Sequence, residues 1–105
     1  KVALRYSTEV AIYCPGGFGT LDELFEVVTL IQTKKMNRIP IILFGSEFWN
    51  PIDKMIKNLL VDEYKTISVD ERELYLITDD IDTILEIAAA ADLKQVKNGI
   101  THSIR

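Results

Sequence analysis

A short apolar segment that leads directly into a glycine-rich turn is the feature that most restricts the fold of this chain. Residues 10–14 read VAIYC, and residues 15–23 read PGGFGTLDE. The apolar segment hardly alternates with polar residues, which is typical of a strand buried on both faces of a parallel sheet. The glycines end the strand, and a helical pattern begins near Leu21. This order predicts a strand–turn–helix unit of an α/β fold.

Two more units of the same kind follow. The predicted strands span residues 10–14, 38–45 and 74–78, and the predicted helices span about 21–34, 51–61 and 81–88. Pro51 after Asn50 is typical of a capped helix start, and Asp79 with Asp80 is typical of another. Short connections between alternating strands and helices predict parallel strands joined by right-handed crossovers.

These elements predict a three-layer, Rossmann-like α/β fold with a parallel sheet and flanking helices. Three strands make a thin sheet, so we expect residues 1–105 to be the C-terminal part of a single nucleotide-binding domain whose N-terminal part is missing. Residues 1–9 are interpreted as the end of a preceding helix. Residues 92–105 are predicted to form a tail.

Composition narrows the classes of function. The formal net charge is −4, and no dense run of Lys or Arg is present, which argues against nucleic-acid binding. The single cysteine, Cys14, cannot form an internal disulfide, and no apolar run is long enough to span a membrane. We therefore expect a cytoplasmic protein that binds neither nucleic acid nor a membrane.

The glycine-rich turn has two interpretations. Backbone N–H groups of a glycine-rich turn at the start of a helix can approach an anion closely, so Gly16, Gly17 and Gly19 with Thr20 form a candidate phosphate site. The spacing differs from both the dinucleotide-binding motif and the P-loop. The alternative is a tight turn that needs glycine only for packing.

Glu23 also has two interpretations. Residues 20–23 match a capping box, in which Thr20 and Glu23 exchange side-chain-to-backbone hydrogen bonds and Glu23 has no catalytic role. On a helical wheel, however, Glu23 lies among apolar residues and away from the polar stripe that includes Asp22 and Glu26. A carboxylate near a helix N-terminus can stabilise developing positive charge, so Glu23 is a candidate catalytic residue.

The segment PGGFGTLDE resembles the PGGxGTxxE signature of the Lonely Guy family of nucleotide phosphoribohydrolases, whose members also carry the label of possible lysine decarboxylase. The resemblance continues through residues 24–35, 40–44 and 48–51 to residues 78–80. It implies hydrolysis of the N-glycosidic bond of a nucleoside 5'-monophosphate, either AMP or a cytokinin riboside monophosphate. The products are the free base and ribose 5-phosphate.

The resemblance also implies roles for individual residues. Gly16, Gly17, Gly19 and Thr20 bind the 5'-phosphate, Glu23 is the catalytic carboxylate, and Glu26 is a candidate supporting residue. The family's catalytic arginine falls immediately before Lys1, so we expect this fragment alone to be inactive.

The resemblance further implies a homodimer, with the helix after the motif near the interface. The same apolar helix face also suits a helix packed between the sheet and a neighbouring helix of its own chain. We expect no cofactor, because the lysines that a pyridoxal phosphate enzyme needs fall on loops or polar helix faces. We expect no metal, because His102 has no Cys or His partner nearby in the sequence. The alternative function is a nucleotide-binding or carrier protein without catalysis.

Overall fold

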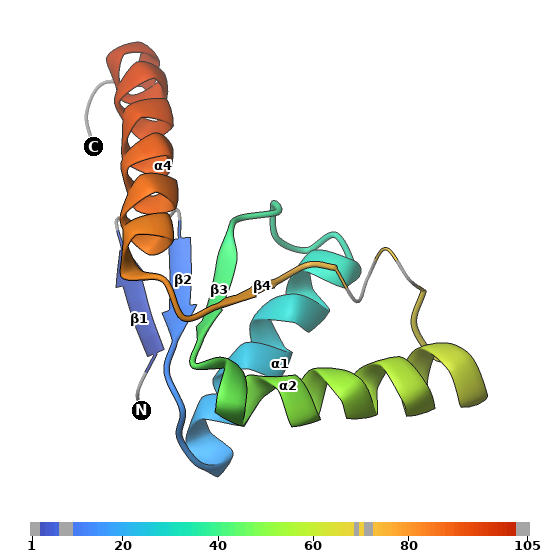
Figure 1. Ribbon diagram of the computed structural model, residues 1–105. Helices are drawn as coiled ribbons and strands as arrows, with labels where there is room; N and C mark the ends of the chain where they lie inside the picture. The colour runs from blue at the N-terminus through green and yellow to red at the C-terminus, as the bar shows by residue number, and fades with distance from the viewer. Residues whose placement is uncertain (1–2, 7–9, 69, 71–72, 103–105) are drawn as a thin grey trace.

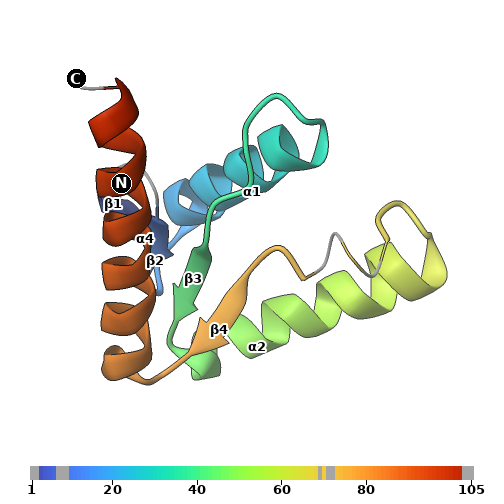
Figure 2. The same cartoon turned by 90° about the horizontal axis from the view of Figure 1, so that it is seen from above.

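The computed structural model describes residues 3–6, 10–68, 70 and 73–102, with side chains for residues 10–68, 70 and 73–91. Their core is a sheet in the order β1-β2-β3-β4. Strands β2 (Val10–Tyr13), β3 (Ile41–Phe44) and β4 (Leu76–Thr78) are parallel, and β1 (Ala3–Tyr6) pairs antiparallel with β2. Helices flank the sheet on both sides (Figures 1 and 2), so the predicted α/β fold is confirmed.

One face of the sheet packs against α1 (Phe18–Gln32) and α2 (Ser46–Met55), and α2 continues into a π-helical segment, η1 (Ile56–Glu63). Successive strand residues point to opposite faces, so Ala11, Tyr13, Ile41 and Leu43 share this one. They form a buried core with three residues of α1 that recur at helical spacing and with Trp49 of α2. The buried residues from α1 are Leu24, Val27 and Ile31.

The opposite face packs against α4 (Ile81–His102). Val10 and Ile42, whose neighbours in sequence face the other core, are buried here with Ala91. Ile84 and Ile87 of α4 pack against them. In Figure 1, α4 therefore stands alone on its side of the sheet, while α1 and α2 share the other side.

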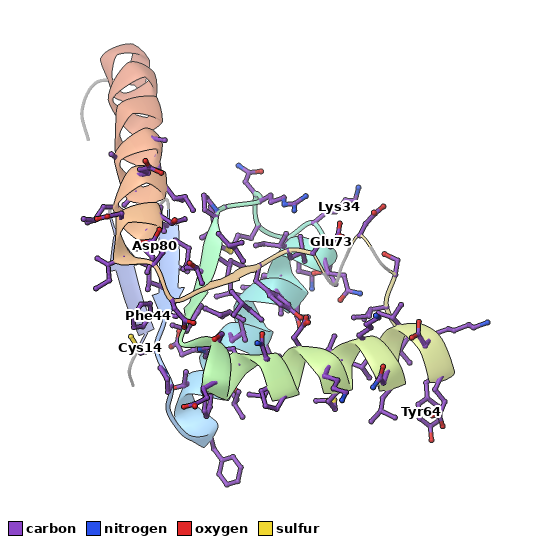
Figure 3. The ribbon with its side chains drawn as sticks, in the orientation of Figure 1. Cys14, Lys34, Phe44, Tyr64, Glu73 and Asp80 are labelled. Atoms are coloured by element: carbon purple, nitrogen blue, oxygen red, sulfur yellow. The ribbon has the colours of Figure 1, made fainter. Side chains whose placement is uncertain are left out.

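The parallel strands bring three strand ends to one edge of the sheet. Tyr13, Phe44 and Thr78 are the last residues of β2, β3 and β4. In Figure 3, the labelled residues Cys14, Phe44 and Asp80 mark this edge, and Lys34 and Glu73 mark the opposite one. Ligands of open parallel sheets bind beyond the carboxyl ends of the strands, so any such site belongs beside Cys14 rather than beside Lys34.

The predicted start of the second helix is wrong. Asn50 and Pro51 lie inside α2, which begins at Ser46, and Asn50 is therefore not its cap. Proline lacks the N–H of an ordinary helical residue, but one absent hydrogen bond is tolerated here because the preceding turn is anchored. Trp49, in that turn, is fully buried, and its ring meets that of Phe48 edge-on at 4.8 Å.

The two ends of the chain also differ from the predictions. The interpretation of residues 1–9 as a helix end is wrong where the structure describes them, because residues 3–6 form β1. Apolar residues at positions 2, 4 and 6 recur with a period of two, which suits a strand. At the other end, α4 extends to His102 and so includes much of the range predicted as a tail. Among the described residues, no helix is both long and apolar enough to cross a membrane.

Candidate functional site

The glycine turn, defined here as Pro15–Gly19, connects β2 to α1 at the edge where the parallel strands end. Helix α1 begins at Phe18, with Gly17 as its N-cap residue and no side-chain cap. The first hydrogen bond of the helix runs from the Leu21 N–H to the Gly17 carbonyl oxygen, at 3.2 Å. The N–H groups of residues 18–20 therefore have no backbone acceptor within the helix, which is the arrangement that binds anions.

The space in front of this turn is open. Apart from the adjacent residues and the nearby backbone of α1 itself, a Cβ atom built on Gly17 or Gly19 meets no heavy atom of the described residues within 4 Å. Neither residue has a positive φ, because Gly45 is the glycine with that conformation among those described. Neither packing nor backbone conformation within the described chain therefore requires glycine at positions 17 and 19. What glycine does provide is unobstructed access to the first turn of α1.

Thr20 takes a different position from its glycine neighbours. Its side chain is 1% exposed and lies on the same side of α1 as the buried residues Leu24 and Val27. The hydroxyl has no hydrogen-bond partner among the described residues. Leaving a buried hydroxyl unpaired costs about 1–3 kcal/mol. Because the hydroxyl is buried, the group of Thr20 that lies in the open first turn of α1 is its backbone N–H.

The capping box predicted for Thr20 and Glu23 is not formed. Because the helix begins at Phe18, Thr20 lies inside α1 instead of before it, and Glu23 lies in the second turn. A capping box needs its hydroxyl residue outside the helix, where the side chain can turn back to a free N–H. The Thr20 half of this alternative explanation is therefore wrong, since the Thr20 hydroxyl has no hydrogen-bond partner among the described residues.

The helix places Glu23 beside the open part of the turn. Residues four apart share a helix face, so Glu23 lies directly below Gly19. Helical side chains lean toward the N-terminus, which directs the Glu23 side chain toward the glycine turn. Its distance along the axis from Phe18 is about 7.5 Å, on the scale of a phosphorylated sugar.

Burial separates Glu23 from the neighbouring carboxylates. Glu23 is half-buried, whereas Asp22 and Glu26 are exposed. This agrees with the wheel position that sets Glu23 apart from the polar stripe. Glu26 lies three residues after Glu23, which is almost one helical turn, and the two side chains occupy neighbouring parts of the α1 surface. Of the two candidate carboxylates, only Glu23 combines partial burial with a position below the open glycine.

A second turn lies against the first and was not identified as part of the site from the sequence. This β3–α2 turn is defined here as Gly45, between the two elements, together with Ser46, the first residue of α2. Gly45 has a φ of 102°, and a Cβ atom added to it lies 3.1 Å from Cγ of Pro15. The glycine that ends the second predicted strand was the available signal, but sequence alone does not show which segment it contacts.

Asp79 holds the β3–α2 turn from the end of β4. Its carboxylate accepts hydrogen bonds from the Ser46 N–H, at 2.7 Å, and from the Ser46 hydroxyl, at 2.6 Å. These two bonds lower the pKa of Asp79 below its ordinary value. The prediction that both Asp79 and Asp80 cap the third helix is therefore half right: Asp80 accepts from the N–H of Asp82 and caps α4, whereas Asp79 caps α2.

Comparison with known proteins identifies the family of this chain. The family model described as "Possible lysine decarboxylase" matches residues 1–88. The chain belongs to this family. The resemblance of PGGFGTLDE to the Lonely Guy signature is thereby confirmed, since this is the domain of that family. A search of curated proteins found no match. Lys1, which the arginine implied by the resemblance would precede, lies outside the described residues.

Two other features bear on the chemistry of this member of the possible lysine decarboxylase family. The described lysine side chains at positions 34, 35, 54, 57 and 65 are all exposed. In the part of the chain that the structure describes, no group of His, Cys, Asp or Glu residues is arranged to hold a metal ion. Neither a lysine-based cofactor site nor a metal site is therefore indicated among the described residues, and Glu23 remains the candidate carboxylate beside the glycine turn.

A cavity of about 200 Å³ lies on the other flank of α1. Leu24, Phe25 and Val28 line it from α1, and Ile56 and Leu60 line it from η1. It contains neither the glycine turn nor Glu23. Its position shows that much of the apolar arc of α1 faces the sheet and η1 of the same chain.

Proposed function

We propose that the protein hydrolyses the N-glycosidic bond of a nucleoside 5'-monophosphate, releasing a free base and ribose 5-phosphate. In this proposal the 5'-phosphate binds at the N-terminus of α1, against the N–H groups of the glycine turn. Glu23 then lies near the sugar. The proposal goes beyond membership of the possible lysine decarboxylase family, which indicates an enzyme but not its substrate.

One observation carries the proposal. Gly17 and Gly19 face open space at a helix start without a side-chain cap, and Glu23 lies on the Gly19 side of the same helix. An anion bound there gains hydrogen bonds from N–H groups that have no intrahelical acceptor, together with the favourable end of the helix dipole. A packing role for these two glycines does not explain the open space.

The chemistry suits a fixed carboxylate. Cleavage of the bond between ribose C1' and the base leaves positive charge on the sugar, in an oxocarbenium-like transition state. A negative carboxylate near C1' stabilises that charge, and it can also orient the attacking water. Water adds its oxygen to C1', the bonding electrons leave with the base nitrogen, and a proton from water completes the balance. The phosphate contacts hold the sugar in place and are unchanged by the reaction.

The test uses the full-length protein with AMP and, separately, with a cytokinin riboside monophosphate, and measures free base and ribose 5-phosphate. Glu23→Gln keeps the size of the side chain and removes its charge. We expect it to lower kcat by about 100-fold or more, with little change in nucleotide affinity. Asp22→Asn is the matched control, because it removes an exposed carboxylate from the same helix at a residue with no proposed role in the site. Full turnover by the Glu23→Gln protein contradicts the catalytic assignment.

The same measurements separate the alternative functions. If both nucleotides bind and neither is cleaved, the protein is a nucleotide-binding or carrier protein. The lysine decarboxylase activity in the family description is not favoured, because a Schiff-base lysine works in a pocket and the described lysines named above are exposed. Release of cadaverine from lysine by the full-length protein contradicts this view.

On the basis of the family resemblance, we also propose that the protein is a homodimer and is located in the cytoplasm. Phe25, on the apolar arc of α1, is 39% exposed and is available for an interface. Much of that arc packs within its own chain, so the dimer needs its own test. Sedimentation of the full-length protein at several concentrations measures the assembly, with Phe25→Asp expected to weaken it.

A further inference from the structure

The β3–α2 turn is fixed from both sides, which makes it a link between distant parts of the chain. On one side, the Gly45 N–H donates to the Thr78 carbonyl oxygen at 3.1 Å, and Ser46 donates both of its hydrogen bonds to Asp79. On the other side, Gly45 starts α2 by accepting from the N–H groups of Phe48 and Trp49. The turn thus has little freedom to shift relative to β4.

The glycine turn has fewer constraints of its own. Its helix has no side-chain cap, and its glycines at positions 17 and 19 have open space beside them. A close neighbour of this turn is Gly45, which lies so near Pro15 that a Cβ atom added to it would approach Cγ at 3.1 Å and Cδ at 3.4 Å. Pro15 has a fixed φ and immediately precedes the glycines, so its position directs their path.

We propose that Asp79 is a positioning residue for the glycine turn. By gripping Ser46, Asp79 holds Gly45 against Pro15, and Pro15 in turn holds the N–H groups of the turn where the phosphate binds. Two charge-assisted hydrogen bonds to one carboxylate are stronger and more directional than neutral ones, which suits this task. The effect on phosphate binding rests on the function proposed above, whereas the effect on the position of the turn does not.

Asp80 provides a matched control. It is adjacent in sequence, exposed like Asp79, and caps a helix start. Its partners are the Asp82 N–H and the Thr83 hydroxyl, both in α4. Removing either carboxylate removes two hydrogen bonds and one cap, but only Asp79 connects to Pro15. A difference between the two variants therefore isolates the positioning role from a general loss of stability.

The experiment uses the full-length protein labelled with nitrogen-15 and two measurements. Without ligand, we expect Asp79→Ala to shift the amide signals of Gly16 and Gly17, and Asp80→Ala to leave them unchanged. With ribose 5-phosphate, we expect Asp79→Ala to raise the dissociation constant about three- to tenfold, since small displacements of a binding group are costly. Ser46→Ala should reproduce both effects, and the double variant should show no further loss because the two residues form one contact.

Asp79→Asn, which keeps the side-chain size, is the second variant if Asp79→Ala does not fold. Unchanged glycine amide signals in the Asp79 variants overturn the inference. So do equal shifts in the Asp79 and Asp80 variants. If the unsubstituted protein does not bind ribose 5-phosphate, the proposed function is wrong, while the amide signals still decide the positioning role.

Discussion

Three helices begin at the same edge of the sheet, and they begin in two different ways. Helix α2 starts beside the Asp79 carboxylate and α4 starts beside the Asp80 carboxylate. Helix α1 begins at Phe18, its N-cap residue Gly17 provides no side-chain cap, and Gly17 and Gly19 have open space beside them. Capping is the ordinary way to satisfy the free N–H groups of a helix start. This contrast is expected if two of the starts serve the fold and the α1 start serves the proposed anion site.

The largest expected effect on stability comes from substituting Gly45, which lies at the start of α2. Alanine there must adopt a φ of 102° and place its Cβ atom 3.1 Å from Pro15. We expect Gly45→Ala to lower the free energy of unfolding by about 2–3 kcal/mol, measured by urea denaturation of the full-length protein. Retained stability would mean that the β3–α2 turn is not held in this conformation.

The Asp80 cap is expected to have the next largest effect. Asp80→Ala removes acceptors for the Asp82 N–H and the Thr83 hydroxyl, at 3.1 and 2.8 Å. We expect a loss of about 1 kcal/mol in the free energy of unfolding. Asp82→Ala, in the same turn, is the control, because Asp82 supplies no cap. Equal losses from the two changes contradict the role assigned to Asp80.

Gly19→Ala should act in the opposite direction to Gly45→Ala. Position 19 lies within α1 and has free space for a methyl group, so alanine is expected to raise the free energy of unfolding by about 0.5–1 kcal/mol. If a phosphate binds there, the same change weakens the binding of ribose 5-phosphate, measured by calorimetry. A more stable protein with unchanged affinity contradicts a phosphate site at Gly19.

Acid sensitivity at Asp79 is the smallest effect, because this side chain is exposed. Hydrogen bonds from Ser46 lower the folded-state pKa of Asp79 from its ordinary value of 3.8. The contact therefore stabilises the fold fully above the unfolded-state pKa, and this contribution is lost as the pH falls through the folded-state pKa. We expect the stability difference between the unsubstituted protein and Asp79→Asn to be constant above about pH 5 and to narrow below it. A difference that does not change with pH contradicts the pKa shift.

Much of the fold was predictable because its signals are local. The apolar segments at residues 10–14, 38–45 and 74–78 each contain a strand of the structure, and each is followed by a helix. Periodicity and turn residues within ten positions are enough to identify such elements. The Asp80 cap is equally local, since its acceptors serve residues two and three positions ahead.

The errors arise where distant residues decide the outcome. Asn50 and Pro51 resemble a helix start, but α2 begins earlier because Asp79, from another strand, binds Ser46. Thr20 and Glu23 match a capping box, but the helix begins before them. The motif identifies the candidate site residues, whereas the open space at Gly17 and the contact of Gly45 with Pro15 depend on the assembled sheet.

Because Phe18 is exposed, a fluorescent side chain at this position can be used to detect ligand binding at the glycine turn. This ring, at the first residue of α1, is 91% exposed, whereas Trp49 is fully buried. A tryptophan at position 18 displaces no packed neighbour and emits from a water-exposed setting distinct from that of Trp49. The fluorescence of the Phe18→Trp protein is therefore expected to change when a ligand binds to the adjacent backbone amides. This includes ligands that undergo no reaction.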